Sequence, residues 1–253
     1  MSKYLLFDIG GTKTRISVSY DGQGIGEPNV YPTPQSYQEG LNEIAKIAQS
    51  LSSDGFEAAG GGIAGPLNKD KSGIINAPNI PDWNGKKLKE DLESILHTTV
   101  LLENDTALVG LGEAVNGRGK DYAIVVYITV STGVNGVRVV NKRLDEHYFG
   151  FEIGKQIIEV ETGTSWEDML AHDGETPEKE AELVATGVFN SVLFWSPEII
   201  ILGGGRMKSV DIELVKKHLN RVLKVYPELP LVERAQLGDI GGLYGALSFL
   251  KEK

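Results

Sequence analysis

Three glycine-rich segments of this 253-residue chain have the composition of anion-binding turns. The first contains Gly10, Gly11, Thr12 and Lys13, the second contains Thr132 and Gly133, and the third contains Gly203, Gly204 and Gly205. Glycine leaves main-chain N–H groups accessible because it has no Cβ, and successive N–H groups can form a concave site for phosphate. Two such turns could hold a polyphosphate from both sides, with Lys13 adding a positive charge. Each of the first two is equally consistent with an ordinary tight hairpin.

The surroundings of these turns exclude two common phosphate motifs. None of the three turns matches GxxxxGK[ST], so a P-loop is excluded there, and none of them matches the GxGxxG fingerprint. Asp8, at the end of the strand before the first turn, could approach Mg²⁺ through water or could be a solvated carboxylate. The third turn lies between an apolar strand and a predicted helix, where a nucleotide base or ribose can approach closely.

An amide and a carboxylate lie together where the predicted strand 99–102 gives way to a helix near Ala107. Ligand sites of α/β proteins gather at this edge of a parallel sheet. Asp105 could accept a proton from an attacking hydroxyl group, while Asn104 fixes another hydroxyl of the same substrate. Asp and Asn are also common helix N-caps. The pair could therefore cap the helix, serve a reaction, or do both.

Alternating strands and helices predict an α/β fold that positions these residues. The expected strands are 4–8, 15–20, 56–63, 99–102, 122–130, 137–140 and 199–202, and the expected helices are 35–51, 87–96, 179–194, 211–225 and 240–253. The segment DIGGTKTRISV returns in altered form as TVSTGVNGVRVV, which indicates a diverged internal repeat. Two similar halves predict two lobes.

Charge and composition narrow the class of partner. The chain has 25 basic and 35 acidic residues, a formal net charge of −10 that disfavours nucleic acid and anionic membranes and favours a small molecule. It has no apolar run long enough for a membrane span and no signal-peptide pattern, so we expect a soluble, cytoplasmic protein. The absence of cysteine and of HExxH spacing among the four histidines excludes thiolate zinc sites and this metalloprotease motif.

The ordered set of motifs resembles the ROK family of sugar kinases and related repressors, within the actin-like ATPase superfamily. The matching segments, in the family's order and spanning nearly the whole chain, are DIGGTKTRISV, GIAGPLN, NAPNIPDWNG, LLENDTALVGLGE, TVSTGVNGV, FEIG, SWEDM, PEIIILGGG and GGLYGAL. The resemblance implies a two-lobed, ribonuclease H-like fold with the ligand cleft between the lobes. We expect a small N-terminal lobe of residues 1–106, joined by the C-terminal helix 241–253, and a larger lobe of residues 107–240.

The resemblance also implies a function, namely ATP-dependent transfer of the γ-phosphoryl group to a hexose hydroxyl, as in a glucokinase. Asp105 corresponds to the family's general base. The implied sugar contacts are Gly65, Asn79, Asn104, Asp105, Glu152, Lys155 and Glu167. The implied ATP contacts are Asp8, which acts through Mg²⁺, and Gly10, Gly11, Thr12, Lys13, Thr132, Gly133, Gly203, Gly204 and Gly205. Family members suggest a homodimer.

Three departures from the family pattern concern the second phosphate turn and the sugar loop. The turn has Ser131, Asn135 and Val137 where glycine is usual. Lys155 replaces a histidine that contacts sugar and zinc, and residues 159–165 replace the cysteine-rich zinc motif. We therefore expect ATP and Mg²⁺ but no zinc. Packing by Trp166 could order the sugar loop instead, or this tryptophan could simply belong to the core.

Two other functions remain open from the sequence. The first is a non-catalytic, sugar- or nucleotide-binding regulator of the same fold, because the family includes repressors. Those repressors carry an N-terminal DNA-binding domain, whereas the first glycine turn here begins at Gly10. The second is a kinase for an N-acetylhexosamine or for fructose. We expect a sugar and ATP as ligands, and neither nucleic acid nor a membrane as partner.

Overall fold

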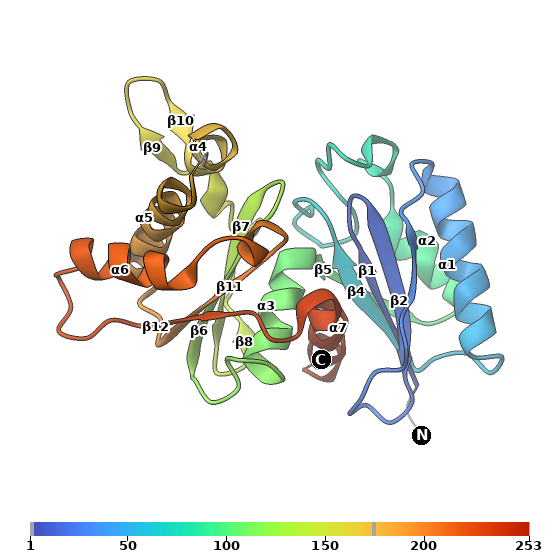
Figure 1. Ribbon diagram of the computed structural model, residues 1–253. Helices are drawn as coiled ribbons and strands as arrows, with labels where there is room; N and C mark the ends of the chain where they lie inside the picture. The colour runs from blue at the N-terminus through green and yellow to red at the C-terminus, as the bar shows by residue number, and fades with distance from the viewer. Residues whose placement is uncertain (1–2, 174–175, 253) are drawn as a thin grey trace.

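The computed structural model describes residues 3–173 and 176–252 and contains two five-stranded sheets with a pair of helices between them (Figure 1). Met1, Ser2 and Lys253, which belong to the predicted small lobe and final helix, lie outside the described residues. In the described part of the chain, no helix combines the length and apolar character that a bilayer span requires. The predicted α/β class is confirmed.

The first sheet has the order β3-β2-β1-β4-β5. Its strands are β1 (Tyr4–Ile9), β2 (Lys13–Ser19), β3 (Asn29–Pro32), β4 (Ala58–Ile63) and β5 (Thr99–Asn104). β1 pairs antiparallel with β2 and parallel with β4. Helices α1 (Tyr37–Leu51) and α2 (Leu88–Leu96) bury one apolar face each against this sheet, with Ile44 and Leu92 in the same core as Phe7. The short helix η1 (Pro81–Trp83) closes that core with Trp83.

The second sheet repeats this plan with the order β12-β11-β6-β7-β8. Its strands are β6 (Ile124–Val130), β7 (Val134–Val140), β8 (Arg143–Leu144), β11 (Ile199–Gly203) and β12 (Leu231–Arg234). β6 pairs antiparallel with β7 and parallel with β11, as β1 does with β2 and β4. The predicted internal repeat is therefore visible as a repeated sheet topology.

The remaining elements lie between residues 153 and 240, in the part of the chain that also forms β11 and β12. They are η2 (Ile153–Lys155), β9 (Ile157–Glu159), β10 (Thr164–Ser165), α4 (Trp166–Asp173), α5 (Pro177–Trp195), η3 (Arg206–Lys208), α6 (Ile212–Val222) and η4 (Gly238–Ile240). β9 and β10 form a separate two-stranded hairpin. Val188 on α5 and Val215 on α6 share a core with Ile200 of β11.

Helices α3 (Asp105–Val115) and α7 (Gly241–Lys251) pack against each other between the two sheets (Figure 1). α3 follows the first sheet yet also packs on β6 and β7, and α7 follows the second sheet yet packs on β1 and β4. The crossing is close because of small residues, since a Cβ on Gly245 would overlap the Leu108 carbonyl oxygen. This arrangement places Asp105, the first residue of α3, at the junction of the two halves.

Several short elements were not predicted. β3, β8, β9, β10, β12 and α4 each have eight residues or fewer, too few to establish a clear hydrophobic period. The predicted longer elements are present, with ends that differ by a few residues. One difference affects the site, because α3 begins at Asp105 rather than near Ala107.

Candidate active site

Asp8 and Arg15 face each other on neighbouring strands beside the first glycine turn. They are directly opposite in the antiparallel register of β1 and β2, and Arg15 Nη1 lies 3.3 Å from Asp8 Oδ2. Their side chains are only 13% and 16% exposed, respectively. Arg15 Nη2 also lies 3.4 Å from Asp239 Oδ2 on η4. One guanidinium group thus bridges a carboxylate of the first sheet and one that precedes α7.

Asp8 and the third glycine turn line one pocket between the two halves, which we call the nucleotide pocket after the ligand that the sequence predicts for these residues. Its lining includes Asp8, Arg15, Tyr127, Gly203, Gly204, Gly205, Lys208, Arg234, Asp239 and Gly242. Gly204 needs to be glycine because its φ is +95° and a Cβ there would overlap the Val130 carbonyl oxygen. Gly10, Gly11, Thr12 and Lys13 are not among the lining residues of this pocket.

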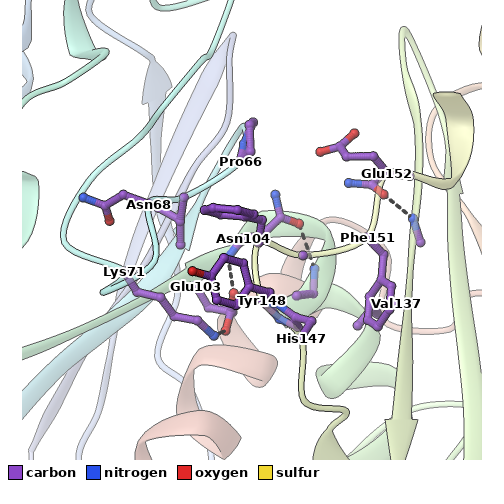
Figure 2. Close-up of a pocket in the computed structure, with 16 residues that line it drawn as sticks. Pro66, Asn68, Lys71, Glu103, Asn104, Val137, His147, Tyr148, Phe151 and Glu152 are labelled. Carbon is purple, nitrogen blue, oxygen red and sulfur yellow. Dashed lines mark hydrogen bonds and ion pairs between the residues drawn. The ribbon is translucent and has the colours of Figure 1, made fainter.

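A second pocket, the cleft pocket, lies where β5 ends and includes Asn104 and Glu152 (Figure 2). One wall comes from the loop after β4, with Pro66, Asn68 and Lys71, and the facing wall comes from the segment after β8, with His147, Tyr148, Phe151 and Glu152. Polar groups and aromatic rings thus line the same cavity. The lining offers both hydrogen-bonding groups and apolar surface, around a cavity of about 20 Å³ that is close to the size of one water molecule.

Asn104 is the N-cap of α3. Its side-chain oxygen accepts a hydrogen bond from the Ala107 N–H at 3.2 Å, and its Nδ2 donates to the Gly65 carbonyl at 3.2 Å. Gly65 has φ +101°, a conformation that favours glycine and turns this carbonyl toward Asn104. The capping role that the sequence left open between Asn104 and Asp105 therefore belongs to Asn104.

Glu103 is a buried carboxylate at the floor of the cleft pocket that the sequence analysis did not select. It pairs with Lys71, and its Oε1 accepts a hydrogen bond from the Asn104 N–H at 2.9 Å. His147 lies nearby, and burial lowers the pKa of its imidazole. Glu103 thus fixes the backbone from which both Asn104 and Asp105 project.

Asp105 begins α3 next to the cleft pocket but is not a lining residue of either pocket. Burial raises the pKa of its own carboxyl group, against a 2.6 Å hydrogen bond donated by the Thr106 N–H. Burial first, and then the charge of Asp105, raise the pKa of Asp8 to about 7, although Arg15 opposes this shift. Burial also raises the pKa of Glu152, against the charge of Lys155, with further contributions from Glu167 and then from Asp105. The charge of Asp105 therefore contributes to the raised pKa of one lining residue of each pocket.

The first glycine turn lies against Asn79, which joins a predicted phosphate contact to a predicted sugar contact. A Cβ on Gly11 would come within 2.7 Å of the Asn79 Cβ. The turn is closed by a 3.0 Å hydrogen bond from the Gly10 N–H to the Lys13 carbonyl. Thr12 and Lys13 have exposed side chains.

The second glycine turn is in contact with Glu167 and, through it, with Lys155. Glu167 Oε2 accepts a hydrogen bond from the Val134 N–H at 2.9 Å and would be 3.3 Å from a Cβ on Gly133. Glu167 Oε1 accepts a 2.6 Å hydrogen bond from Lys155 Nζ, and this bond raises the pKa of the lysine. Lys155 therefore pairs with the carboxylate of Glu167.

Trp166 anchors the segment that carries Glu167. Its ring is fully buried, its Nε1 donates to the Leu183 carbonyl at 2.8 Å, and a Cβ on Gly187 would overlap the ring. Ser165, the residue before it, accepts a 3.2 Å hydrogen bond from the Asp168 N–H. Trp166 can therefore both belong to the core, where it packs against α5, and order the segment of the sugar loop that carries Glu167.

Asp8 is the candidate contact for a metal ion that the sequence predicts. In residues 3–173 and 176–252, no group of three or more His, Asp or Glu side chains is arranged to hold a metal ion. Asp8 nevertheless suits the indirect Mg²⁺ contact predicted from the sequence, since Mg²⁺ usually keeps several waters and takes one or two carboxylates with substrate phosphates. Space for such waters exists because Gly242, which faces Asp8, has no side chain, and a Cβ there would lie 3.2 Å from the Asp8 Cγ.

Comparison with known proteins places the chain in a family. The ROK family model matches residues 4–163. N-acetyl-D-glucosamine kinase of Escherichia coli O6:H1 is 26% identical over 299 aligned positions, which cover 96% of this chain and 97% of the relative. The ROK hexokinase from Thermus thermophilus superimposes with a TM-score of 0.83 at 26% identity, with 99% of both chains covered.

A ROK family glucokinase from Streptomyces griseus, solved with glucose and AMPPNP, has the same fold, with a TM-score of 0.82 at 22% identity and full coverage of both chains. The two-lobed actin-like architecture predicted from the sequence is confirmed by these neighbours. With a family model that matches well over half of its residues, this chain belongs to the ROK family.

Proposed function

We propose that this protein is an ATP-dependent sugar kinase in which Asp105 is the general base. The observation that carries the proposal is the position of Asp105 at the start of α3, at the junction of the two sheets and directly after Asn104, which lines the cleft pocket. The named activities of the relatives, which are kinases for N-acetylglucosamine and for hexoses, support the same reaction class.

Phosphoryl transfer requires few covalent steps from the protein. The sugar hydroxyl oxygen forms a bond to the γ-phosphorus, the bond from that phosphorus to the β–γ bridging oxygen breaks, and ADP leaves. Asp105 takes the hydroxyl proton, and its raised pKa suits this role because a base works best when its pKa approaches the working pH. Asn104, Glu152 and Glu167 would orient the sugar by hydrogen bonds, so that the hydroxyl meets the phosphate in line.

Mg²⁺ bound with ATP would neutralise charge on the transferring phosphate, held at Asp8 through water. The turn 203–205, which lines the nucleotide pocket, would take the adenosine end. We expect main-chain N–H groups of the first two turns, which do not line that pocket, to approach the phosphates when the nucleotide binds. Four expectations from the sequence stay predictions: a small N-terminal lobe joined by the last helix, a homodimer, a cytoplasmic location and independence from zinc. The regulator alternative is not favoured, because the N-acetyl-D-glucosamine kinase and the ROK hexokinase are matched over nearly their full length, whereas a ROK family transcriptional regulator of the same fold is matched over 78% of its chain.

A coupled assay of sugar-dependent ADP release tests the proposal. Purified protein with Mg²⁺ and ATP is screened against glucose, mannose, fructose and N-acetylhexosamines. We expect turnover at least tenfold above the ATPase rate without sugar for one of these compounds. If no sugar stimulates ADP release while calorimetry shows that a sugar and ATP both bind, the protein is a non-catalytic binder and the proposal fails.

A further inference from the structure

Arg15 is a largely buried cation that the proposed mechanism does not use. Its guanidinium group has five N–H donors, and the contacts described above direct one Nη atom at Asp8 and the other at Asp239. Donors therefore remain for a ligand in the nucleotide pocket, which Arg15 lines. A planar guanidinium group also matches phosphate oxygens in geometry as well as charge.

The other arginine of this pocket is committed to the fold. Arg234 donates to the main-chain carbonyls of Met207 and Val210, so it holds the segment after the third glycine turn. Lys208 lies beside that turn, on the side that would take the adenosine. At the opposite end of the pocket, where Asp8 would hold Mg²⁺ and the phosphates, Arg15 is the lining residue that carries positive charge.

The bond from Arg15 to Asp239 is easily exchanged. The Asp239 side chain is 78% exposed, and an ion pair with such a partner contributes little in water. The pair with Asp8 is more protected, but a Mg²⁺ complex that approaches Asp8 would supply the positive charge that Arg15 supplies in its absence. Both present partners of Arg15 can thus be replaced when a polyphosphate enters.

We infer that Arg15 binds the polyphosphate of the nucleotide, as a further substrate-binding residue of this site. The inference rests on the proposed function, because it takes ATP as the ligand. The sequence suggested Lys13 for the phosphate charge. Lys13 is on the same face of β2 as Arg15, two residues away, but it is exposed at the turn, whereas Arg15 projects into the pocket.

Calorimetric binding of a non-hydrolysable ATP analogue with Mg²⁺, and of adenosine alone, tests the inference without turnover. Loss of a charge-assisted phosphate contact predicts that Arg15→Gln weakens the analogue about 10- to 100-fold and leaves adenosine within about twofold. The matched control is Arg221→Gln, which removes an equal charge from an arginine that is 64% exposed on α6, pairs with Glu182 and does not line the pocket. We expect no change in that variant. An equal loss of analogue and adenosine in Arg15→Gln would mean a structural role and overturn the inference.

A double-mutant cycle separates a phosphate contact from an effect through Asp8. If Arg15 contacts phosphate, Arg15→Gln weakens the analogue in the Asp8→Asn background as well, by at least tenfold. If Arg15 only neutralises Asp8, its substitution has no effect in that background, and the inference is wrong. Wild-type ADP release is measured in parallel. If the wild type shows sugar-dependent ADP release and Arg15→Gln binds the analogue as tightly as the wild type does, this inference is wrong and the kinase proposal stands. If the wild type binds the analogue, Arg15→Gln weakens that binding and no sugar stimulates ADP release, the kinase proposal is wrong and this inference stands.

Discussion

The hairpins β1–β2 and β6–β7 occupy equivalent places in the two halves of the molecule but carry different side chains. Counting back from the glycine turn in each register, the pair Asp8 and Arg15 in the first hairpin corresponds to Thr129 and Asn135 in the second. The first hairpin thus presents a carboxylate and a guanidinium group, and the second presents neutral groups and main-chain N–H. The two halves share their sheet topology, but at these two positions the first hairpin carries charged side chains and the second carries neutral ones.

This difference assigns distinct tasks to two similar turns. The charged hairpin suits a metal-bound polyphosphate, and its carboxylate shares the nucleotide pocket with the third glycine turn. The uncharged hairpin receives a carboxylate from elsewhere, because Glu167 of α4 accepts a hydrogen bond from the Val134 N–H. The second turn, a predicted phosphate contact, is therefore hydrogen-bonded to Glu167, a predicted sugar contact.

The largest expected difference between the hairpins comes from substituting the corresponding residue of each, Asp8 in the first and Thr129 in the second. Asp8→Asn removes the only carboxylate of its hairpin that faces the pocket, and we expect kcat/KM for Mg-ATP to fall about 10²- to 10³-fold, a typical loss when one preorganised electrostatic group is removed. Thr129→Val in the second hairpin should change it by less than about threefold. Steady-state kinetics of both variants decide this, and equal losses would show that the hairpins are functionally equivalent.

The pH dependence of turnover tests whether Asp105, at the junction of the two halves, acts as the base. A base must be ionised, and burial raises the pKa of Asp105 above its ordinary value, so kcat/KM should fall about tenfold per pH unit on the acid side, beginning at a higher pH than a solvated aspartate would give. A rate that is flat down to the ordinary aspartate pKa would contradict this assignment.

The stability of the fold should respond to the same group with a defined sign. Because the folded-state pKa of Asp105 is raised, its ionisation costs folding free energy once the pH exceeds the unfolded pKa. Asp105→Asn should therefore raise the Tm at pH 8 relative to wild type and have little effect near pH 4. A lower Tm at pH 8 would indicate that the carboxylate stabilises the fold.

A smaller effect is expected at the contact between the second turn and the sugar loop. Glu167→Gln weakens two hydrogen bonds to a charged acceptor, and we expect the sugar KM to rise about tenfold. Lys155→Ala should raise it by less than about fivefold, since the lysine is 60% exposed. Glu159→Gln, in the adjacent hairpin, is the matched control and should leave the KM unchanged. A larger effect of Lys155→Ala than of Glu167→Gln would mean that the lysine itself contacts the sugar.

How far the sequence could predict this site depends on what determines each residue's position. The glycine turns, Asp8 and Asn104–Asp105 were selected because their types and local neighbours are distinctive. Arg15 was missed because its importance depends on the register that places it opposite Asp8, although a hairpin centred on the first glycine turn would have suggested that pairing. Glu103 gave no local signal, since its partner Lys71 comes from a different loop.

The smallest expected effect concerns zinc. The chain has no cysteine, and Trp166 with its bond to Leu183 holds the segment that a metal would otherwise order. Metal analysis of purified protein should find less than one zinc per ten chains, and a zinc-selective chelator should leave the rate with Mg²⁺ unchanged. Stoichiometric zinc whose removal abolishes activity would show that the sugar loop is organised by a metal after all.

The most direct test of the account is the Asp105→Asn variant, measured for turnover and for ligand binding in the same preparation. The amide keeps the shape of the side chain but cannot accept a proton, so kcat should fall about 10²- to 10⁴-fold while the sugar Kd stays within an order of magnitude. Asn104 should still cap α3 and leave the fold intact. Wild-type turnover in Asp105→Asn at saturating ATP and sugar would contradict the central claim, because the base would then be elsewhere.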